Sequence, residues 1–269
     1  MFPIYRKALP ADPEGLREAI EESLRRVVRP AGPMVSIEGQ SYPRLASIRV
    51  SLDHATAGDR RPRPPAPAGS VIPALQVENF EISGAPIHLQ GGAAINLSCR
   101  AREVEITQGR DRDGNILLLL KNAAEGSIEI ATPMADLEAL LRAEGKAAAA
   151  QQGVAVEDVR IKMHTRSERS LDVAVQVRAK KLFLSATVRI NGRLEIDEQL
   201  NARLSGLQCA GDGKLGSLAC GFLSPHLQRF NNRAFPLAAL PLGGIKLRDV
   251  RIAAGADLRV TAQFGEAPA

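Results

Sequence analysis

The sequence predicts an α+β fold whose sheet is mainly antiparallel, and three observations support this fold class. Several segments alternate apolar and polar residues, which is the pattern of a strand with one buried face. Two segments pair a proline helix start with apolar residues at helical spacing. Hydrophobic residues make up 45% of the chain but aromatic residues only 3%, so the interior must be aliphatic.

The clearest strand pattern lies between Lys180 and Leu207. Apolar residues occupy every second position at Leu182, Leu184, Ala186, Val188 and Ile190, and again at Leu194, Ile196, Leu200, Ala202 and Leu204. A two-residue turn at Asn191-Gly192 would mix apolar and charged side chains on one face. We therefore predict a hairpin with a three-residue loop that pairs Val188 with Leu194 and Leu182 with Leu200. This hairpin would form an antiparallel ribbon with one apolar face and one charged face.

The first helix is predicted from Asp12-Pro13-Glu14, which supplies an N-cap, a proline at the first helical position and an acid in the first turn. The apolar stripe that follows consists of Leu16, Ala19, Ile20, Leu24, Val27 and Val28. Pro30 and Gly32 are expected to end it. A strand over 48–52 comes next, and the proline-rich segment 60–69 is predicted to be a solvated, extended loop.

The middle of the chain is predicted to be a series of strands separated by turn signals at Gly84, Gly91-Gly92 and Asp113-Gly114. The predicted strands are 74–82, 87–89, 93–99, 104–106, 116–120 and 128–130. The run from Ile116 to Leu120 does not alternate, so we expect it to be covered on both faces.

A second helix is predicted from Thr132-Pro133, with the stripe Met134, Leu137, Leu140 and Leu141 before Gly145. Strands then restart at Val154. A third helical stripe is predicted over 221–232, with Pro225 limiting its start, and a final hairpin over 245–252 and 258–264. We predict a single elongated domain over 1–269, in which a helix followed by a meander occurs twice, over 12–131 and 132–264.

The sequence lacks recognisable catalytic, metal-binding and cofactor-binding motifs. The run from Gly211 to Gly216 matches a dinucleotide fingerprint, but no βαβ unit surrounds it, so we interpret it as a hairpin turn. The histidines, His54, His88, His164 and His226, are far apart and no Cys-x-x-Cys is present. We therefore predict no metal site, no cofactor and no catalytic residues, because nucleophile and phosphate-binding motifs are also absent from the sequence.

The charge of the chain points to anionic partners. The net charge is +5 and the isoelectric point is about 9.4, which favours surfaces such as lipid phosphate groups. A soluble surface with some excess arginine explains the same numbers. Nucleic acid is disfavoured, because the basic residues are spread along every strand and few aromatic residues could stack on bases. The oligomeric state is not predicted.

Localisation is predicted from two features. The N-terminus lacks the apolar run of a signal peptide and no window approaches ~18 apolar residues, so we expect a cytoplasmic protein that is at most peripheral to a membrane. Cys99, Cys209 and Cys220 fit a reducing compartment. Cys209 and Cys220 could meet if oxidised, but we favour buried free thiols.

Several segments also carry a resemblance to a known family. They are 132–141, 156–160, 186–195, 235–237 and 240–250, together with the N-terminal helix, Tyr42-Pro43 and the strand 48–52. In this order they resemble the LmeA-like phospholipid-binding family of bacteria, which belongs to the tubular lipid-binding (TULIP) superfamily. The resemblance implies a long, curled sheet wrapped around two or three helices, and binding or transfer of phospholipid without chemistry. The sequence departs from the family in the 60–69 loop, in Cys209 and Cys220, and in showing no export signal or membrane anchor.

We predict non-catalytic binding of a phospholipid or another long apolar ligand in an aliphatic groove. The residues predicted to line it are Leu16, Ile20, Leu24, Leu137, Leu140, Leu141, Leu182, Leu184 and Val188. The same apolar faces could instead close as a solid core, in a structural or adaptor protein that acts through its surface or its proline-rich loop. A lipid hydrolase is a further alternative, for which His226 and Cys220 are the candidates.

Overall fold

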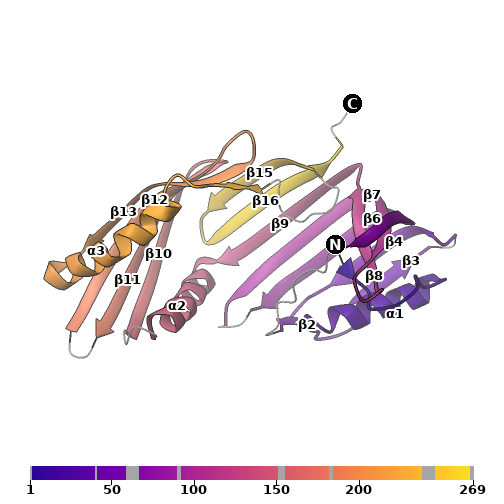
Figure 1. Ribbon diagram of the computed structural model, residues 1–269, viewed down its shortest axis with the longest axis horizontal. Helices are drawn as coiled ribbons and strands as arrows, with labels where there is room; N and C mark the ends of the chain where they lie inside the picture. Colours follow the sequence, from indigo (N-terminus) through magenta and orange to yellow (C-terminus); the bar gives the residue numbers. More distant parts are fainter. Residues whose placement is uncertain are drawn as a thin grey trace.

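The computed structural model describes residues 2–39, 41–58, 67–89, 92–150, 155–181, 184–237 and 246–266. Within these ranges the chain forms two sheets and three helices (Figure 1). Strands dominate and most pairings are antiparallel, which agrees with the predicted α+β class. Two pairings are parallel, those of β6 with β4 and with β5, so the larger sheet is mixed.

The large sheet contains eleven strands within the described residues, and seven of them follow the order β15-β16-β9-β7-β6-β4-β3. In addition, β8 pairs with β7 and β1 with β8, while β5 pairs with β6 and β2 with β5. Its strands are β1 (Phe2–Pro3), β2 (Val28–Arg29), β3 (Val35–Glu38), β4 (Arg44–Ser51), β5 (Thr56–Ala57), β6 (Ala68–His88), β7 (Ala94–Arg110), β8 (Ile116–Asn122), β9 (Glu125–Pro133), β15 (Leu247–Ala254) and β16 (Asp257–Gly265).

The small sheet is antiparallel throughout and has the order β10-β11-β12-β13-β14. Its strands are β10 (Ala155–Ser167), β11 (Ser170–Lys181), β12 (Leu184–Ile196), β13 (Asn201–Gly211) and β14 (Ala234–Pro236). The chain returns from β14 to β15 and β16, which pair with each other and, through β16, with β9 of the large sheet. The final hairpin is therefore confirmed.

Helix α1 (Pro13–Leu24) packs against the large sheet, whereas α2 (Met134–Ala150) lies along β10 and α3 (Gly213–Phe230) lies over β12 and β13. The predicted start of α1 is confirmed, because Asp12 Oδ1 accepts a hydrogen bond from the backbone N–H of Gly15 at 2.7 Å. Its predicted end is wrong. The helix stops at Leu24, because Val28 pairs with Ala57 as part of β2.

The other two helices, in contrast, are longer than predicted. Helix α2 begins where predicted but continues through Gly145 to Ala150. Helix α3 begins at Gly213 and contains Pro225 in its interior. A proline ring crowds the carbonyl four residues earlier, and that residue is Gly221. The Ser224 hydroxyl donates a hydrogen bond to the Cys220 carbonyl at 2.8 Å, one residue before that position.

The predicted hairpin around Asn191-Gly192 is wrong in its turn and in its register. Both residues lie inside the continuous strand β12, and Val188 pairs with Val177 and Gly211 instead of Leu194. The turn falls instead at Asp197 to Leu200, where Asp197 Oδ1 accepts the backbone N–H of Asn201 at 2.8 Å. The glycine at 192 leaves room for Leu207, since a Cβ there would lie 2.7 Å from Leu207 Cδ2.

Two strands of the large sheet are longer than predicted. Strand β6 continues through Gly84, which is the site of a register shift, and β7 joins two segments that were predicted separately. The prediction for β8 is confirmed for its first three residues, because Ile116, Leu117 and Leu118 are all buried, whereas Leu119 and Leu120 are only partly buried.

Two apolar cores occupy the molecule. The larger lies between α1 and the large sheet and includes Leu16, Ile48 and Val104. The smaller joins the two sheets, because Leu171 and Ile196 of the small sheet pack in one cluster with Val250 and Ile252 of β15. The backbone N–H of Ile252 also donates to the Glu168 carbonyl at 2.8 Å.

Candidate functional site: an apolar cavity between helix α1 and the large sheet

The large core is not completely filled. A cavity of about 430 Å³ remains between α1 and the large sheet. Its lining consists of Phe2, Ile20, Leu24, Ile48, Val50, Leu52, Phe80, Ile82, Leu97, Cys99, Ile106, Leu118, Leu120, Ile128 and Phe264. Apart from the thiol of Cys99, every one of these side chains is a hydrocarbon.

The strands place these residues by their two-residue period. Phe80 and Ile82 of β6 are two positions apart, as are Leu97 and Cys99 of β7, so each pair points to one face of the sheet. The same spacing relates Ile48 to Val50 in β4 and Leu118 to Leu120 in β8. The cavity wall is therefore a single face of the large sheet.

Helix α1 covers this face with Ile20 and Leu24, which are one helical turn apart. Its solvent side carries ion pairs, in which Arg17 contacts Glu14 at 2.6 Å and Glu21 at 2.9 Å. Such exposed pairs contribute little to stability, so the helix is held in place mainly by its apolar stripe.

Phe264 of β16 forms the wall at the side of the C-terminal hairpin. It pairs across the sheet with Gly126 of β9, and its ring lies over that glycine. A Cβ at position 126 would be 2.1 Å from Phe264 Cε2, so only glycine leaves room for the ring. Phe264 is 2% exposed, which shows that this wall is closed to solvent.

Cys99 is the only lining residue with a titratable group. Burial raises the pKa of its thiol to about 11, so the thiol is protonated and uncharged at neutral pH. The cavity therefore offers no charge to a ligand. Its size falls within the range of about 300–1,000 Å³ that is typical of small-molecule sites.

The structure brings together only part of the predicted lining. Ile20 and Leu24 line the cavity, and Leu16 is fully buried in the core beside it. Leu137, Leu140 and Leu141 belong to α2 beside β10, and Val188 is buried in the small sheet, so none of these four reaches the cavity. Leu182 and the side chain of Leu184 lie outside the described residues.

Most of the lining comes from strands that the sequence reasoning did not assign to a site. Phe80, Ile128 and Phe264 belong to segments predicted as strands. The sequence did not predict that these distant strands pair in one sheet. The alternation of Ile48, Val50 and Leu52 was the available signal, because it marks one apolar face.

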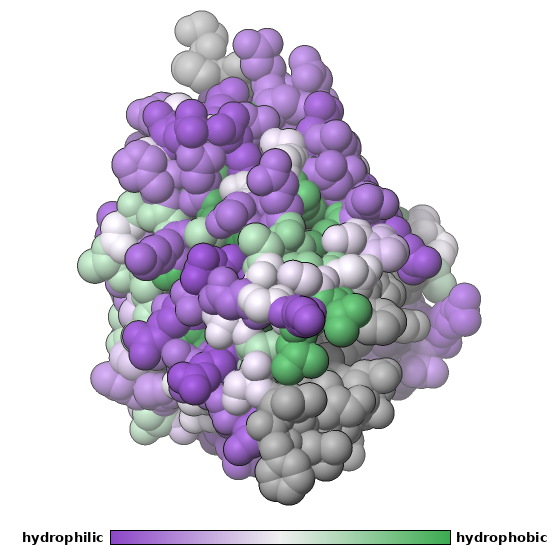
Figure 2. All heavy atoms as spheres, turned by 90° about the vertical axis from the view of Figure 1, so that its left-hand side faces the viewer, coloured by the Kyte–Doolittle hydropathy of each residue, from purple (hydrophilic) through white to green (hydrophobic). Residues whose placement is uncertain are grey.

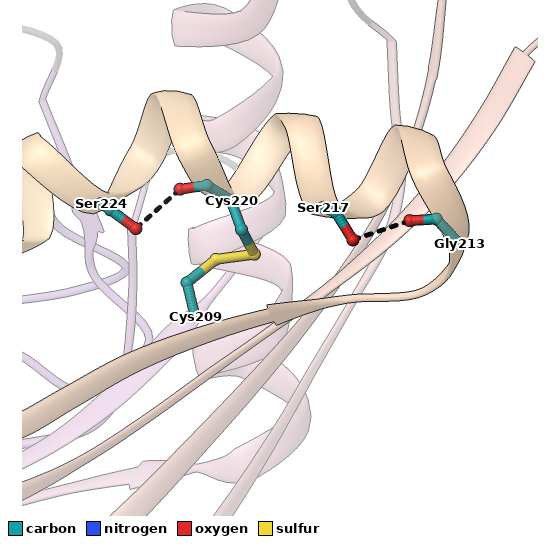
Figure 3. Close-up of a disulfide and its surroundings, with 5 residues drawn as sticks. All are labelled: Cys209, Gly213, Ser217, Cys220 and Ser224. Atoms are coloured by element: carbon teal, nitrogen blue, oxygen red, sulfur yellow. Dashed lines mark hydrogen bonds between the residues drawn. A yellow bond between two sulfur atoms is a disulfide. The ribbon is translucent and has the colours of Figure 1, made fainter.

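The prediction of free thiols at Cys209 and Cys220 is wrong. Cys209 of β13 and Cys220 of α3 form a disulfide, with Cα atoms 5.5 Å apart (Figure 3). They meet because the run from Gly211 to Gly216 is a strand-to-helix turn and not a hairpin turn, so α3 folds back over β13. Cys220 thus has no free thiol for the hydrolase alternative, and the side chain of His226 lies outside the described residues.

The described part of the chain offers neither a metal-binding cluster nor a helix that could span a membrane. There, no three His, Cys, Asp or Glu side chains lie close enough together to hold a metal ion. None of the helices in these ranges is both long and apolar enough to cross a bilayer. Of the proline-rich segment 60–69, residues 60–66 lie outside the described ranges, and Ala68 and Gly69 already belong to β6.

Comparisons of the chain with protein-family models, with curated proteins and with solved structures gave no match.

Proposed function

We propose that the protein binds a long apolar ligand, such as an acyl chain of a phospholipid, in the cavity between α1 and the large sheet, and that it does so without chemistry. The observation that carries this proposal is the cavity of about 430 Å³ whose walls are hydrocarbon apart from one neutral thiol.

The physical chemistry of the cavity favours such a ligand. Protein interiors are close-packed, with few voids larger than a water molecule, so a space of this size is unusual unless something occupies it. Water gains little there, because it would find no hydrogen-bond partners on hydrocarbon walls. A methylene chain that enters gains about 0.8 kcal/mol for each buried CH₂ group.

The phospholipid class is supported by the resemblance to the LmeA-like family and by the net charge of +5, which favours a phosphate headgroup at the surface. The proposal includes the finer fold assignment, which is a single elongated domain of the tubular lipid-binding type whose large sheet wraps around α1. Transfer of the ligand between membranes is a further part of this proposal.

The first prediction tests the cavity by filling it. Leu24 is half-buried at the end of α1 and lines the cavity, so Leu24→Trp places an indole ring in the space of the ligand. Overfilling an apolar site costs about 1–3 kcal/mol, which corresponds to a loss of ligand affinity of roughly 5- to 150-fold. The measurement is native mass spectrometry of the full chain purified without detergent, before and after addition of phospholipid.

Leu141→Trp is the matched control, because Leu141 also lies on an amphipathic helix but is on α2, away from the cavity. We expect this variant to retain ligand like the original protein. Equal retention by both variants would show that the ligand is not in this cavity. A protein that carries no lipid and takes up none would favour the solid-core adaptor alternative.

A further inference from the structure

Helix α3 exposes apolar side chains to solvent. Leu218 is 62% exposed and Phe230 is 46% exposed, and Leu215 and Leu223 are also exposed. The side of the helix opposite Leu218 is buried, at Gly216 and Cys220, which are one turn apart. Leu223 and Phe230, seven and fourteen positions from Gly216, lie on that same side of the helix. Leu218 is two positions from Gly216, about 200° around the helix, so it points away from the small sheet.

The position of α3 is fixed by its buried side. The backbones of Gly211 and Gly216 are in close contact, since a Cβ at Gly211 would lie 2.0 Å from the Gly216 carbonyl carbon. The disulfide between Cys209 and Cys220 joins the next turn of the helix to β13 (Figure 3). The helix is thus held with the side chain of Leu218 in solvent, uncovered by the described part of the chain.

The charged side chains of α3 itself are of one sign. Residues 213–230 contain no Asp or Glu, and their basic residues are Lys214 and Arg229. The neighbouring acid, Asp212, forms an ion pair with Arg189 at 3.0 Å. Figure 2 looks at the end of the molecule that carries the small sheet and α3, and it shows hydrophobic surface lying beside hydrophilic surface.

We propose that the outward face of α3 docks on an anionic phospholipid bilayer. A helix whose outward face exposes Leu215 and Leu218, and which carries basic and no acidic residues, matches the interfacial zone of such a membrane, where apolar side chains enter about 5–10 Å and cations meet lipid phosphates. Because α3 carries basic and no acidic residues, its charge complements an anionic membrane surface, which favours this surface over a protein partner. The inference goes beyond the cavity and does not depend on what occupies it.

The test is cosedimentation of the full chain with vesicles of phosphatidylcholine, with and without phosphatidylglycerol. We expect binding to the anionic vesicles and little binding to the neutral ones. Leu218→Asp should reduce binding to anionic vesicles about tenfold or more, because it places a carboxylate in the interface. Ile72→Asp is the matched control, since Ile72 is equally exposed but lies on β6 of the large sheet.

Charge is tested in the same assay. Lys214→Glu should weaken binding to anionic vesicles, whereas Arg112→Glu, in the exposed turn between β7 and β8, should leave it unchanged. The proposal is overturned if the unaltered protein binds neither vesicle, if it binds both equally, or if Leu218→Asp and Ile72→Asp behave alike.

The membrane proposal and the cavity proposal can fail independently. Native mass spectra of Leu218→Asp should still show ligand in the cavity, and Leu24→Trp should still sediment with vesicles.

Discussion

Cys99 illustrates how burial alone sets the chemistry of a side chain. It is the free cysteine of the chain, since Cys209 and Cys220 are joined, and it lies in the apolar cavity wall. No positive group lines the cavity to stabilise a thiolate, and burial raises the pKa of the thiol from 9.0 to about 11. The thiol therefore acts as a small apolar group and as a reporter of the cavity.

The second prediction uses this reporter. Because the thiolate is the reactive form, alkylation of Cys99 by iodoacetamide at pH 8 should be roughly 100-fold slower in the folded protein than in the urea-unfolded protein. Added phospholipid should slow it further by occupying the cavity. The measurement is mass spectrometry of the alkylated chain over time, with Cys99→Ala as the blank. Equal rates in the folded and unfolded protein would show that the thiol is not buried as described.

The third prediction concerns the glycines of α3. A Cβ at Gly216 would lie 2.7 Å from the Gly211 carbonyl carbon and 3.0 Å from the Thr187 carbonyl oxygen, so Gly216→Ala forces the helix away from the sheet. We expect this variant to lose about 1–3 kcal/mol of unfolding free energy. Gly221→Ala, in the same helix, meets nothing within 4 Å and should gain about 0.5–1 kcal/mol from helix propensity. Urea denaturation of both variants provides the comparison.

At the scale of the element, the sequence predicted the starts of α1 and α2 and the faces of the strands better than the start of α3 and the turns. Asp12-Pro13 marks the start of α1 because the cap and the proline act within one turn of the chain. Asn191-Gly192 was misleading because the same dipeptide that favours a tight turn also fits a strand where glycine makes room for Leu207. The true turn at Asp197 carries no glycine, and its conformation is held by an aspartate side chain.

The site was predictable only in part for a related reason. The apolar stripe of α1 identified Ile20 and Leu24 correctly as residues facing an interior. The wall opposite them combines strands from β1 to β16, and pairing between such distant segments leaves no local pattern in the sequence. The stripe of α2 has the same pattern as that of α1, so periodicity could not show that Leu137 and Leu140 lie at a different sheet.

At the scale of the whole molecule, an ion-pair cluster joins the two sheets next to the smaller core. Asp249 of β15 contacts Arg169, in the turn between β10 and β11, at 2.6 Å, and it contacts Arg251 at 2.7 Å. Arg251 also contacts Glu168 of that turn at 3.1 Å. The hydrogen bonds from Arg251 and Arg169 lower the pKa of Asp249 from its ordinary value of 3.8.

The fourth prediction follows from the direction of this shift. A carboxyl group with a lowered pKa stabilises the folded state above its unfolded pKa of 3.8, and the contribution is lost as the pH falls through the lowered value. Asp249→Asn should therefore lower the Tm by about 2–4 °C at pH 6 and by less at pH 3. Asp113→Asn, in the exposed turn between β7 and β8, is the control. A Tm difference for Asp249→Asn that stays the same at both pH values would contradict the proposed role of the ion pairs.

The place of β16 in the large sheet has a consequence for the order of folding. This strand pairs with β9 and carries Phe264 into the cavity wall, although the whole small sheet and its helices lie between them in the chain. During synthesis β9 leaves the ribosome long before β16, so its edge waits unpaired while more than a hundred residues are added. Contacts of such long sequence separation form slowly. The cavity is thus completed only after β16 has left the ribosome, and until then the unpaired edge of β9 is accessible to chaperones.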